Sequence, residues 1–437
     1  MPFMHNLLIV AFLGLIGSFS WVLVQQENSG RAEEVIPWRR GNTHTHTLWS
    51  DGDAPPELVI KWYVDNGYDF LVLSDHNLVQ KGEDWFPIAE GSRLTPAQVD
   101  LLRTKFGEDW PEVREQDGKQ SMRLRTLPEL KDRFEGDGDF RLIPGEEVTD
   151  RFQSKEVHIN AVNVDEVIRP QRGGSVPQTI QRNLDAIIAY GKASGREVMA
   201  HLNHPNFAWS ITVEDLASMR GERFFEIYNG HRSTNNQGDA TRPSTERLWD
   251  EALVLRLHGG MGDGELLYGM ATDDAHNHYE VDEVSVPGRG WVMVRSASLK
   301  EDDIVKAMKA GDFYSSSGVT LKDVRKVGDR LELEIDGRPG IEYRTEFIAT
   351  RMVEGKPGEI GEIVSTSTSL TPGHTMQGDE LYLRARITSS RPHPRPYLAG
   401  DLEMAWTQPV RPASAEGTLS DQSNNHSPGD NHDSTSQ

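Results

Sequence analysis

The sequence predicts an α/β protein in which seven strand–helix units form a closed or nearly closed barrel, followed by a small β-rich region. Three observations predict this fold. Short runs of β-branched and aromatic residues alternate with helical segments between residues 36 and 318. The number of such runs, seven, suits a barrel built from strands with helices between them. From residue 319 to residue 411 the pattern changes to short strands without intervening helices.

The predicted strands are short, and most of them end in polar side chains. They cover residues 35–44, 69–75, 140–148, 156–164, 197–204, 224–230 and 267–274. The predicted helices cover residues 55–67, 176–195, 212–219, 244–257 and 300–311. Several of these helices begin with Pro, Ser or Thr and end in Gly, as capped helices do. Strands that alternate with helices in this way imply a parallel sheet.

Three further segments lie outside this alternation. Residues 81–135 are predicted to be a helical insertion that carries Trp85, Phe86 and Trp110, and it is either a substrate lid over the barrel mouth or a surface excursion. The β-rich region 319–411 contains no chemistry that the sequence reveals, so a packing role is expected. The tail 412–437 has almost no apolar residues and is predicted to be disordered.

The N-terminal segment 1–35 predicts export. Residues 6–24 form an apolar run, and a polar linker follows it. This pattern is typical of a secretory signal peptide or of a single membrane anchor. Both alternatives stay open, because the run is long for a signal peptide and no Lys or Arg precedes it. The expected location is periplasmic, secreted, or anchored at the outer side of a membrane.

Composition narrows the class of ligand. The chain has 437 residues and a formal net charge of -22, which argues against nucleic acid and anionic membrane surfaces as partners. It has no cysteine, so any metal must be held by nitrogen and oxygen atoms. A small-molecule substrate is expected, and the sequence does not indicate an oligomeric state.

The stretch GNTHTHTLWSDG, residues 41–52, suggests a metal site. In a strand, side chains two residues apart face the same way, about 7 Å from each other. A single His-x-His pair often has a structural explanation, but many of the 15 histidines recur at the downstream strand ends, the active face of a parallel barrel. They are His44, His46, His76, His158, His201, His204, His231 and His276, and the acidic groups at the same level are Asp51, Asp75, Glu146, Glu147, Glu226, Asp273 and Asp274.

These motifs, in this order, resemble the PHP domain, the family of polymerase and histidinol-phosphatase metallohydrolases. The matching residues are His-x-His at 44–46, Ser-Asp-Gly at 50–52, Asp-His at 75–76, the Gly-x-Glu motif in IPGEEV with its glutamate taken as Glu146, His158, His-Pro at 204–205 and Asp-x-His at 274–276. Smaller features, including NHPNF and FFEIYNGH, resemble the CehA/McbA-like branch that contains carbaryl hydrolase. The resemblance covers about residues 36–318 and implies a distorted (β/α)7 barrel.

The resemblance implies up to three divalent ions. The first would be held by His44, His46, Glu146 and Asp274, the second by Glu146, His158 and His204, and the third by Asp51, His76 and His276. Glu146 would bridge the first two ions. The family spacing selects Asp274 over Asp273 and His204 over His201, and the residues that are not selected are expected to orient ligands. With nitrogen and oxygen ligands alone, Zn, Mn and Fe all remain candidates.

A site with such ions predicts a hydrolase, because divalent ions lower the pKa of bound water and stabilise charge on the oxygen under attack. Glu146, Asp274 and His231 are the expected catalytic residues, with His231 either a proton donor or a structural histidine. A phosphoester is the first predicted substrate class, and a carbamate, carboxylic ester or amide is the second. Two other hypotheses stay open: a non-catalytic PHP-like binding module, and an amidohydrolase-type barrel, which also begins with His-x-His but usually has eight strands.

Overall fold

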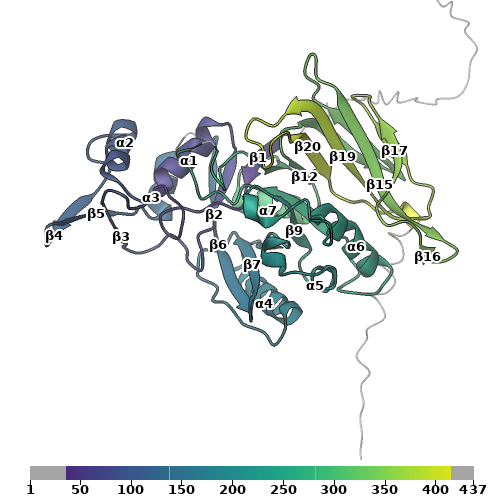
Figure 1. Ribbon diagram of the computed structural model, residues 1–437, viewed down its shortest axis with the longest axis horizontal. Helices are drawn as coiled ribbons and strands as arrows, with labels where there is room; N and C mark the ends of the chain where they lie inside the picture. Colours follow the sequence, from purple (N-terminus) through teal and green to yellow (C-terminus); the bar gives the residue numbers. More distant parts are fainter. Residues whose placement is uncertain (1–35, 137, 281, 415–437) are drawn as a thin grey trace, which may run out of the picture. The chain divides into compact units, whose positions relative to one another are not determined.

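The computed structural model describes residues 36–414 except residues 137 and 281, and it shows a mixed α/β protein (Figure 1). The predicted export segment 1–35 and nearly all of the predicted disordered tail lie outside the described residues. Within the described part of the chain, no helix is both long and apolar enough to cross a bilayer. Most strands belong to a 14-stranded sheet, and two smaller sheets have three strands each.

All seven predicted strands of the region 36–318 are present. They are β1 (Trp38–Asn42), β2 (Phe70–Leu73), β6 (Arg141–Phe152), β7 (Lys155–Val162), β8 (Met199–Leu202), β9 (Phe224–Asn229) and β10 (Tyr268–Thr272). They lie side by side in the order β10-β9-β8-β7-β6-β2-β1. The same edge of this part of the sheet therefore receives the residues that follow β1, β2, β8, β9 and β10.

The prediction of a wholly parallel sheet is wrong for one strand. β1, β2 and β6 pair in parallel, and so do β8, β9 and β10, but β7 runs antiparallel to both β6 and β8. The physical reason is the connection between β6 and β7, which consists of residues 153 and 154 only. A parallel crossover needs a dozen or more residues, whereas a hairpin needs about two.

The ends of β1 and β10 also meet. Thr45 forms a parallel bridge with Ala275, the His46 amide donates to the Ala275 carbonyl over 2.9 Å, and the Asp274 amide donates to the His44 carbonyl over 3.0 Å. Along their lengths, however, the pairings of the described strands continue from β1 into β11 (Trp291–Arg295) and β12 (Phe313–Ser316). A complete seven-stranded barrel is therefore not established by these pairings.

The predicted helices are present as α1 (Pro56–Asp65), α4 (Val176–Ser194), α5 (Val213–Ala217), α6 (Thr245–Leu257) and α7 (Glu301–Lys309). The longest of them, α4, has a capping residue at each end, and these residues made its ends predictable. The Ser175 hydroxyl accepts from the Gln178 amide at the start of α4, and Gly195, with φ 73°, ends the helix in the left-handed region. Ile180, Leu184 and Ile187 are fully buried in the core beside β7 and β8.

The segment 81–135 contains more than the predicted helices. Helices α2 (Pro96–Phe106) and α3 (Leu127–Phe134) are present, and both begin at a Thr capping box. Between and around them lies a three-stranded antiparallel sheet of β3 (Trp85–Pro87), β4 (Val113–Gln116) and β5 (Lys119–Arg123). These strands escaped prediction because all three are short, and because β4 and β5 are mostly polar, without the alternating apolar pattern that marks a half-buried strand.

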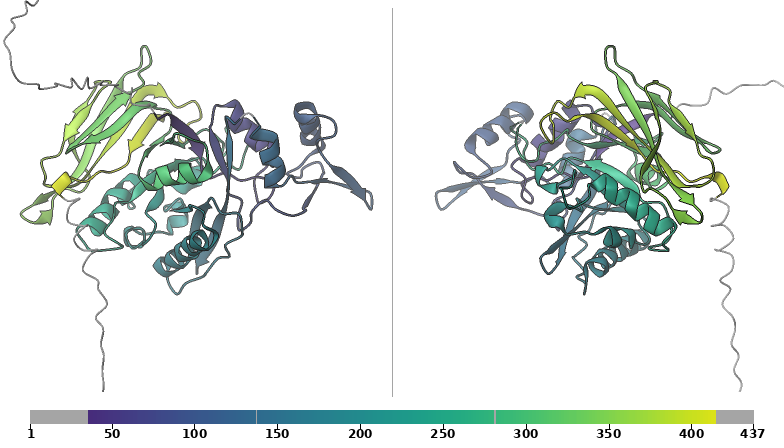
Figure 2. Two further views of the ribbon diagram at one scale, coloured as in Figure 1. Left: turned by 180° about the vertical axis from the view of Figure 1, so that it is seen from behind. Right: turned by 45° about the vertical axis from the view of Figure 1, so that its right-hand side comes forward.

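The region from residue 319 onward consists of strands, as its sequence predicts. They are β13 (Leu321–Val327), β14 (Arg330–Ile335), β15 (Tyr343–Val353), β16 (Lys356–Pro357), β17 (Glu362–Ser367), β18 (Gly373–Thr375), β19 (Glu380–Pro392) and β20 (Leu402–Thr407). The long strands β15, β19 and β20 lie side by side (Figure 2). β20 pairs with β12, so the 14-stranded sheet runs continuously into this region.

Side chains of this region also share a core with the rest of the protein. Tyr382 and Trp406 are buried in the same cluster as Trp249 of α6. Next to them, the Arg384 guanidinium forms a bidentate pair with the Asp250 carboxylate of α6, with distances of 2.8 and 2.6 Å. Both side chains are buried, so this contact binds the C-terminal strands to the helix that follows β9.

Candidate metal centre

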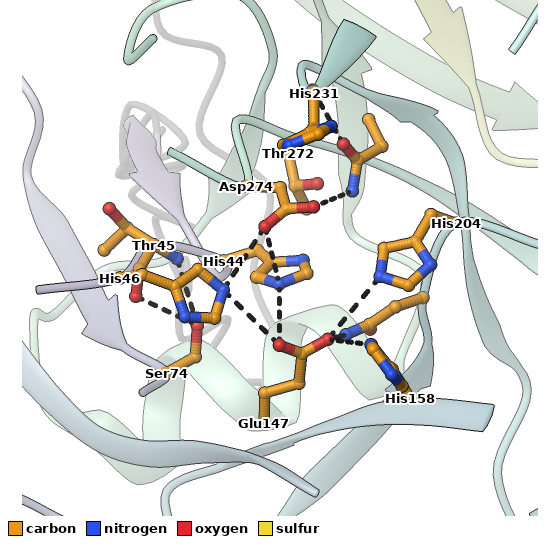
Figure 3. Close-up of polar contacts among 12 residues, drawn as sticks. His44, Thr45, His46, Ser74, Glu147, His158, His204, His231, Thr272 and Asp274 are labelled. Carbon is orange, nitrogen blue, oxygen red and sulfur yellow. Dashed lines mark hydrogen bonds and ion pairs between the residues drawn. The ribbon is translucent and has the colours of Figure 1, made fainter. Parts of the chain in front are cut away.

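Imidazole and carboxylate groups from separate strand ends converge on one buried carboxylate, that of Glu147 in β6. Figure 3 shows His44, His46, His158 and His204 directed toward it. Glu147 Oε2 lies 3.5 Å from His44 Nε2, 3.4 Å from His46 Nε2 and 2.8 Å from His76 Nδ1. Glu147 Oε1 lies 3.1 Å from His158 Nδ1 and 3.5 Å from His204 Nε2. Glu147 is only 1% exposed, so one carboxylate faces five imidazoles away from solvent.

The predicted bridging residue, Glu146, is not part of this group. Neighbouring side chains of a strand point to opposite faces, so only one of the two glutamates can face the histidines. Glu146 faces the other way, and its Oε1 accepts a hydrogen bond from the Ile168 amide. The correct choice was available in the sequence, because the Gly-x-Glu spacing of the family selects Glu147 when it is counted from Gly145.

The turn after β1 brings in the next carboxylate. Within residues 47–52, the amides of Ser50 and Gly52 both donate to the Thr47 carbonyl. A Cβ atom on Gly52 would lie 2.7 Å from the His46 carbonyl oxygen, so only glycine fits this close approach. The turn places Asp51 Oδ1 3.3 Å from His276 Nε2 and Asp51 Oδ2 3.5 Å from His76 Nε2.

Three groups of these side chains have ligand atoms close enough to hold a metal ion. They are His46, Asp51, His76 and His276; His44, His46 and Glu147; and Glu147, His158 and His204. With Glu147 in the place of Glu146, these groups contain eight of the nine residues that the PHP resemblance implies as ligands. The ninth, Asp274, places its Oδ1 3.2 Å from both His44 Nε2 and His46 Nε2, and it therefore lies against the first two groups.

The structure distinguishes Asp274 from Asp273. The Asp273 carboxylate is turned away from the histidines and accepts from the Tyr63 hydroxyl and from the backbone amides of residues 288, 289 and 290. It thereby fixes the loop that leads into β11. Asp274 has φ 49°, which lies in the left-handed region that non-glycine residues rarely adopt. This backbone turn directs the two consecutive aspartates to different surroundings.

The structure also shows which of His204 and His201 belongs to the cluster. His204 contacts Glu147, whereas His201 is fully buried, with its Nδ1 3.8 Å from Glu226 and outside the three groups. Glu226 has a different role, because its Oε1 lies 2.7 Å from His44 Nδ1 and its Oε2 accepts from the His204 amide. A carboxylate behind a histidine fixes the tautomer and the direction of the ring. The sequence placed Glu226 at this level but did not assign it this role.

Asp75 supports the turn that carries Asp51. Its carboxylate accepts from the Thr47 amide, the Ser50 hydroxyl and the Gln80 side-chain amide. The insertion 81–135 reaches the same turn, because Arg93 Nη1 donates to the carbonyls of Ser50 and Gly52 over 2.7 and 3.0 Å. The insertion is therefore attached to the edge of the candidate centre.

His231 lies next to the cluster without belonging to its three groups. Its ring centre is 5.6 Å from that of His276, and its Nδ1 is 2.7 Å from the Ser233 hydroxyl. Burial lowers the pKa of His231 below its ordinary value. The ring is therefore placed beside the predicted third ion, with one nitrogen already engaged by Ser233.

Buried charges inside the cluster shift several pKa values. Burial alone would raise the pKa of Glu147, but His76, His44 and His158 outweigh it and hold that pKa well below its usual range. Burial lowers the pKa of His46 to about 3, so this imidazole is neutral and able to act as a ligand. In contrast, burial raises the pKa of Glu146, which faces no histidine, to about 7.

The donor atoms fit divalent cations. Buried polar atoms normally have a hydrogen-bond partner, and those that lack one require an explanation. In the cluster, the buried atoms without such a partner include His44 Nε2, His46 Nε2, Glu147 Oε2 and both ring nitrogens of His158. These atoms face one another across the groups described above. Imidazole nitrogens and carboxylate oxygens in this arrangement suit Zn, Mn or Fe and offer no thiolate.

Comparisons with known proteins give distant structural likenesses only. No protein-family model and no curated protein matches the sequence. A two-domain protein from Bacteroides vulgatus that contains a predicted PHP-like metal-dependent phosphoesterase is 13% identical, with a TM-score of 0.39, and the match covers 86% of this chain and 96% of that one. A candidate metal-dependent phosphoesterase from Bifidobacterium adolescentis is 14% identical, with a TM-score of 0.29 and coverages of 62% and 96%.

An amidohydrolase from Chromobacterium violaceum, with bound sulfate and no metal, is also 14% identical, with a TM-score of 0.25 and coverages of 55% and 88%. TM-scores below 0.5 do not establish a shared fold. The functional argument therefore rests on the geometry of the cluster itself.

Proposed function

We propose that this protein is a metal-dependent hydrolase of the PHP type and that its first substrate class is phosphoesters. The observation that carries the proposal is the position of Glu147, a buried carboxylate whose two oxygens face two different sets of imidazoles. A structural ion pair needs one partner for a carboxylate, and desolvating five imidazoles around it is costly. A carboxylate shared between cations accounts for this arrangement.

The proposed ligands follow from the groups in the structure. His44, His46, Glu147 and Asp274 would hold one ion, Glu147, His158 and His204 a second, and Asp51, His76 and His276 a third. The finer fold assignment that goes with this proposal is a distorted (β/α)7 barrel, supported by seven strands and by the bridge between the ends of β1 and β10. The CehA/McbA-like branch is likewise part of the proposal and rests on the sequence motifs.

The chemistry divides between the ions and the chain. Divalent ions supply a nucleophile from water near neutral pH and stabilise charge on the oxygen under attack. The chain orients the ligands, with Glu226 behind His44 and Asp75 behind the turn of Asp51. In this proposal Asp274, next to His44, would accept the proton that leaves the attacking water, and His231, next to His276, would donate a proton to the leaving group.

One observation supports the alternative of carbamate, carboxylic ester or amide hydrolysis. Arg232 is the cation nearest to the sequence motifs, and its guanidinium pairs with Asp282 and donates to the carbonyls of Pro396 and Tyr397. Arg93 likewise directs Nη1 to backbone carbonyls. Phosphate-binding sites commonly use free guanidinium groups, and these two are engaged elsewhere. A carboxylic ester has no anionic oxygen and does not need them.

Two assays test this proposal. Metal analysis of the purified chain should find more than one equivalent of Zn, Mn or Fe, and less than one equivalent after incubation with Mn or Zn would favour a non-catalytic binding module. Bis-p-nitrophenyl phosphate and 1-naphthyl N-methylcarbamate, assayed side by side, separate the two hydrolase classes. Turnover of the phosphodiester supports phosphoesterase activity, and turnover of the carbamate alone overturns it in favour of the alternative.

The proposal extends to location and partners. The apolar run at residues 6–24 supports export, either as a cleaved signal peptide or as an anchor at the outer side of a membrane. The net charge of -22 supports a small-molecule substrate and argues against nucleic acid. Fractionation of cells that express the full chain tests export, because retention in the cytoplasm would contradict it.

A further inference from the structure

The loop that follows His204 presents an aromatic side chain to the candidate centre. Phe207 belongs to the short helix η1 (Phe207–Trp209), and its ring centre lies 5.1 Å from that of His204 and 6.2 Å from that of His158. These two histidines flank Glu147. Phe207 is partly exposed, whereas His204 is buried. Phe207 therefore exposes part of its surface beside this group.

The backbone of this loop is held in an unfavourable conformation. Ala208 and Trp209 have φ values of 50° and 52°, and His204 has φ 22°. Consecutive non-glycine residues in the left-handed region cost free energy and persist only where the surroundings hold them. Backbone strain of this kind concentrates at functional sites, and here the strained residues lie on both sides of Phe207.

A buried asparagine holds the loop in place. Asn206 is 3% exposed, and its Nδ2 donates to the carbonyls of Asn235 and Pro243, both over 3.0 Å. Asn235 Nδ2 donates back to the Asn206 carbonyl over 3.2 Å. These bonds connect the loop after β8 to the segment between β9 and α6. The loop that carries Phe207 is thus hydrogen-bonded to this segment at Asn235 and at Pro243.

The neighbouring Trp209 is also fixed. The Arg242 guanidinium lies 4.2 Å from the centre of its ring, and Lys155 Nζ donates to its carbonyl over 2.7 Å. A cation over an aromatic face restrains the ring. With Trp209 occupied by Arg242, Phe207 is the aromatic ring of η1 that adjoins the histidines.

We propose that Phe207 is a specificity-determining residue and that the site accepts esters with an aromatic leaving group. The proposal rests on the hydrolase function and names its substrate class. In the reaction, the oxygen of water bonds to the phosphorus atom, one proton of that water passes to Asp274, and the bond from phosphorus to the aryl oxygen breaks. The aryloxide leaves with the electron pair and takes up a proton in solution or from His231. Contact between its ring and Phe207 would favour aryl over alkyl esters.

Equilibrium binding tests this recognition apart from catalysis. The full chain, loaded with Mn²⁺, is titrated calorimetrically with phenylphosphonate and with methylphosphonate. Wild type should prefer the phenyl compound at least 3- to 10-fold, since a ring–ring contact supplies roughly that factor. In Phe207→Ala this preference should fall to about 2-fold or less by the loss of the same contact. Phe207→Tyr should keep it, and Phe207→Leu, which has no ring, should not.

Methylphosphonate is the internal control. Its dissociation constant should change less than about 2-fold among the variants, because it does not reach the ring. A phenyl preference that survives in Phe207→Ala, or that is absent from wild type, overturns the proposal. Failure to bind either phosphonate overturns it, and the metal content of the same sample decides whether the metal centre fails as well. If binding follows these expectations but no ester is hydrolysed, the hydrolase function fails and aromatic recognition by Phe207 stands.

Discussion

The adjacent residues Glu146 and Glu147 provide a test in which each is the matched control of the other. Both are buried carboxylates on β6, and substitution by Gln keeps the shape of either side chain. Glu147 faces five imidazoles, whereas Glu146 accepts from the Ile168 amide on the opposite face. If Glu147 is shared between two ions, Glu147→Gln removes one ligand from each of them. Glu146→Gln removes a ligand from neither.

The expected magnitudes follow from these surroundings. Removing one partner of a buried charged cluster costs about 3–5 kcal/mol. If about 4 kcal/mol of this is lost from transition-state stabilisation, kcat falls about 1000-fold. Burial raises the pKa of Glu146 to about 7, so near neutral pH a large part of this group is already uncharged. Gln imitates that uncharged form, so we expect kcat of Glu146→Gln to stay within about 3-fold of wild type.

The assay combines metal content and turnover. Both variants are purified in parallel, bound metal is measured per chain, and kcat is determined on the best ester found for wild type. Glu147→Gln should lose at least one equivalent of metal, and Glu146→Gln none. The reasoning is refuted if Glu146→Gln loses activity and metal while Glu147→Gln keeps both. Circular dichroism of both variants checks that the loss does not come from unfolding.

The remaining predictions concern ligand orientation, pH and the C-terminal strands. Glu226→Gln should weaken metal binding about 10- to 100-fold, measured by metal titration, because it weakens the support behind His44; unchanged affinity would contradict this role. Burial raises the pKa of Glu222 from 4.5 to about 8, so its contribution to stability is fully present below pH 4.5 and is lost as the pH rises towards 8. Urea unfolding at pH 5, 6.5 and 8 should therefore show that the unfolding free energy of wild type falls by about 1.4 kcal/mol per pH unit relative to that of Glu222→Gln. The same dependence of unfolding free energy on pH in both proteins would count against this. Asp250→Ala should cost about 3–5 kcal/mol of unfolding free energy, because the guanidinium of Arg384 stays buried without its carboxylate; normal metal content shows that the centre is intact, and a loss below 1 kcal/mol would disprove a structural role for the pair.

Local patterns explain what could be predicted from the sequence. The seven strands, their helices and the histidines at the strand ends depend on residues that are close together in the chain, such as the Ser175 cap and the stop at Gly195. The choice of Asp274 over Asp273 and of His204 over His201 followed from motif spacing, and the structure brings the selected residues to the cluster. The choice of Glu146 failed because the Gly-x-Glu spacing was not counted from Gly145, and the structure shows that Glu147 is the glutamate that faces the histidines.

Long-range contacts decided the rest. The pairing of β12 with β20 and the carboxylate of Glu226 behind His44 join residues far apart in the chain. No local pattern specifies such partners, since hydrogen bonding between strands is the same for any sequence and the choice of neighbour depends on how all the elements bury their apolar faces together. The sequence alone therefore determined which chemical groups are present and at which strand ends they lie. Only the tertiary structure determined which of them face one another.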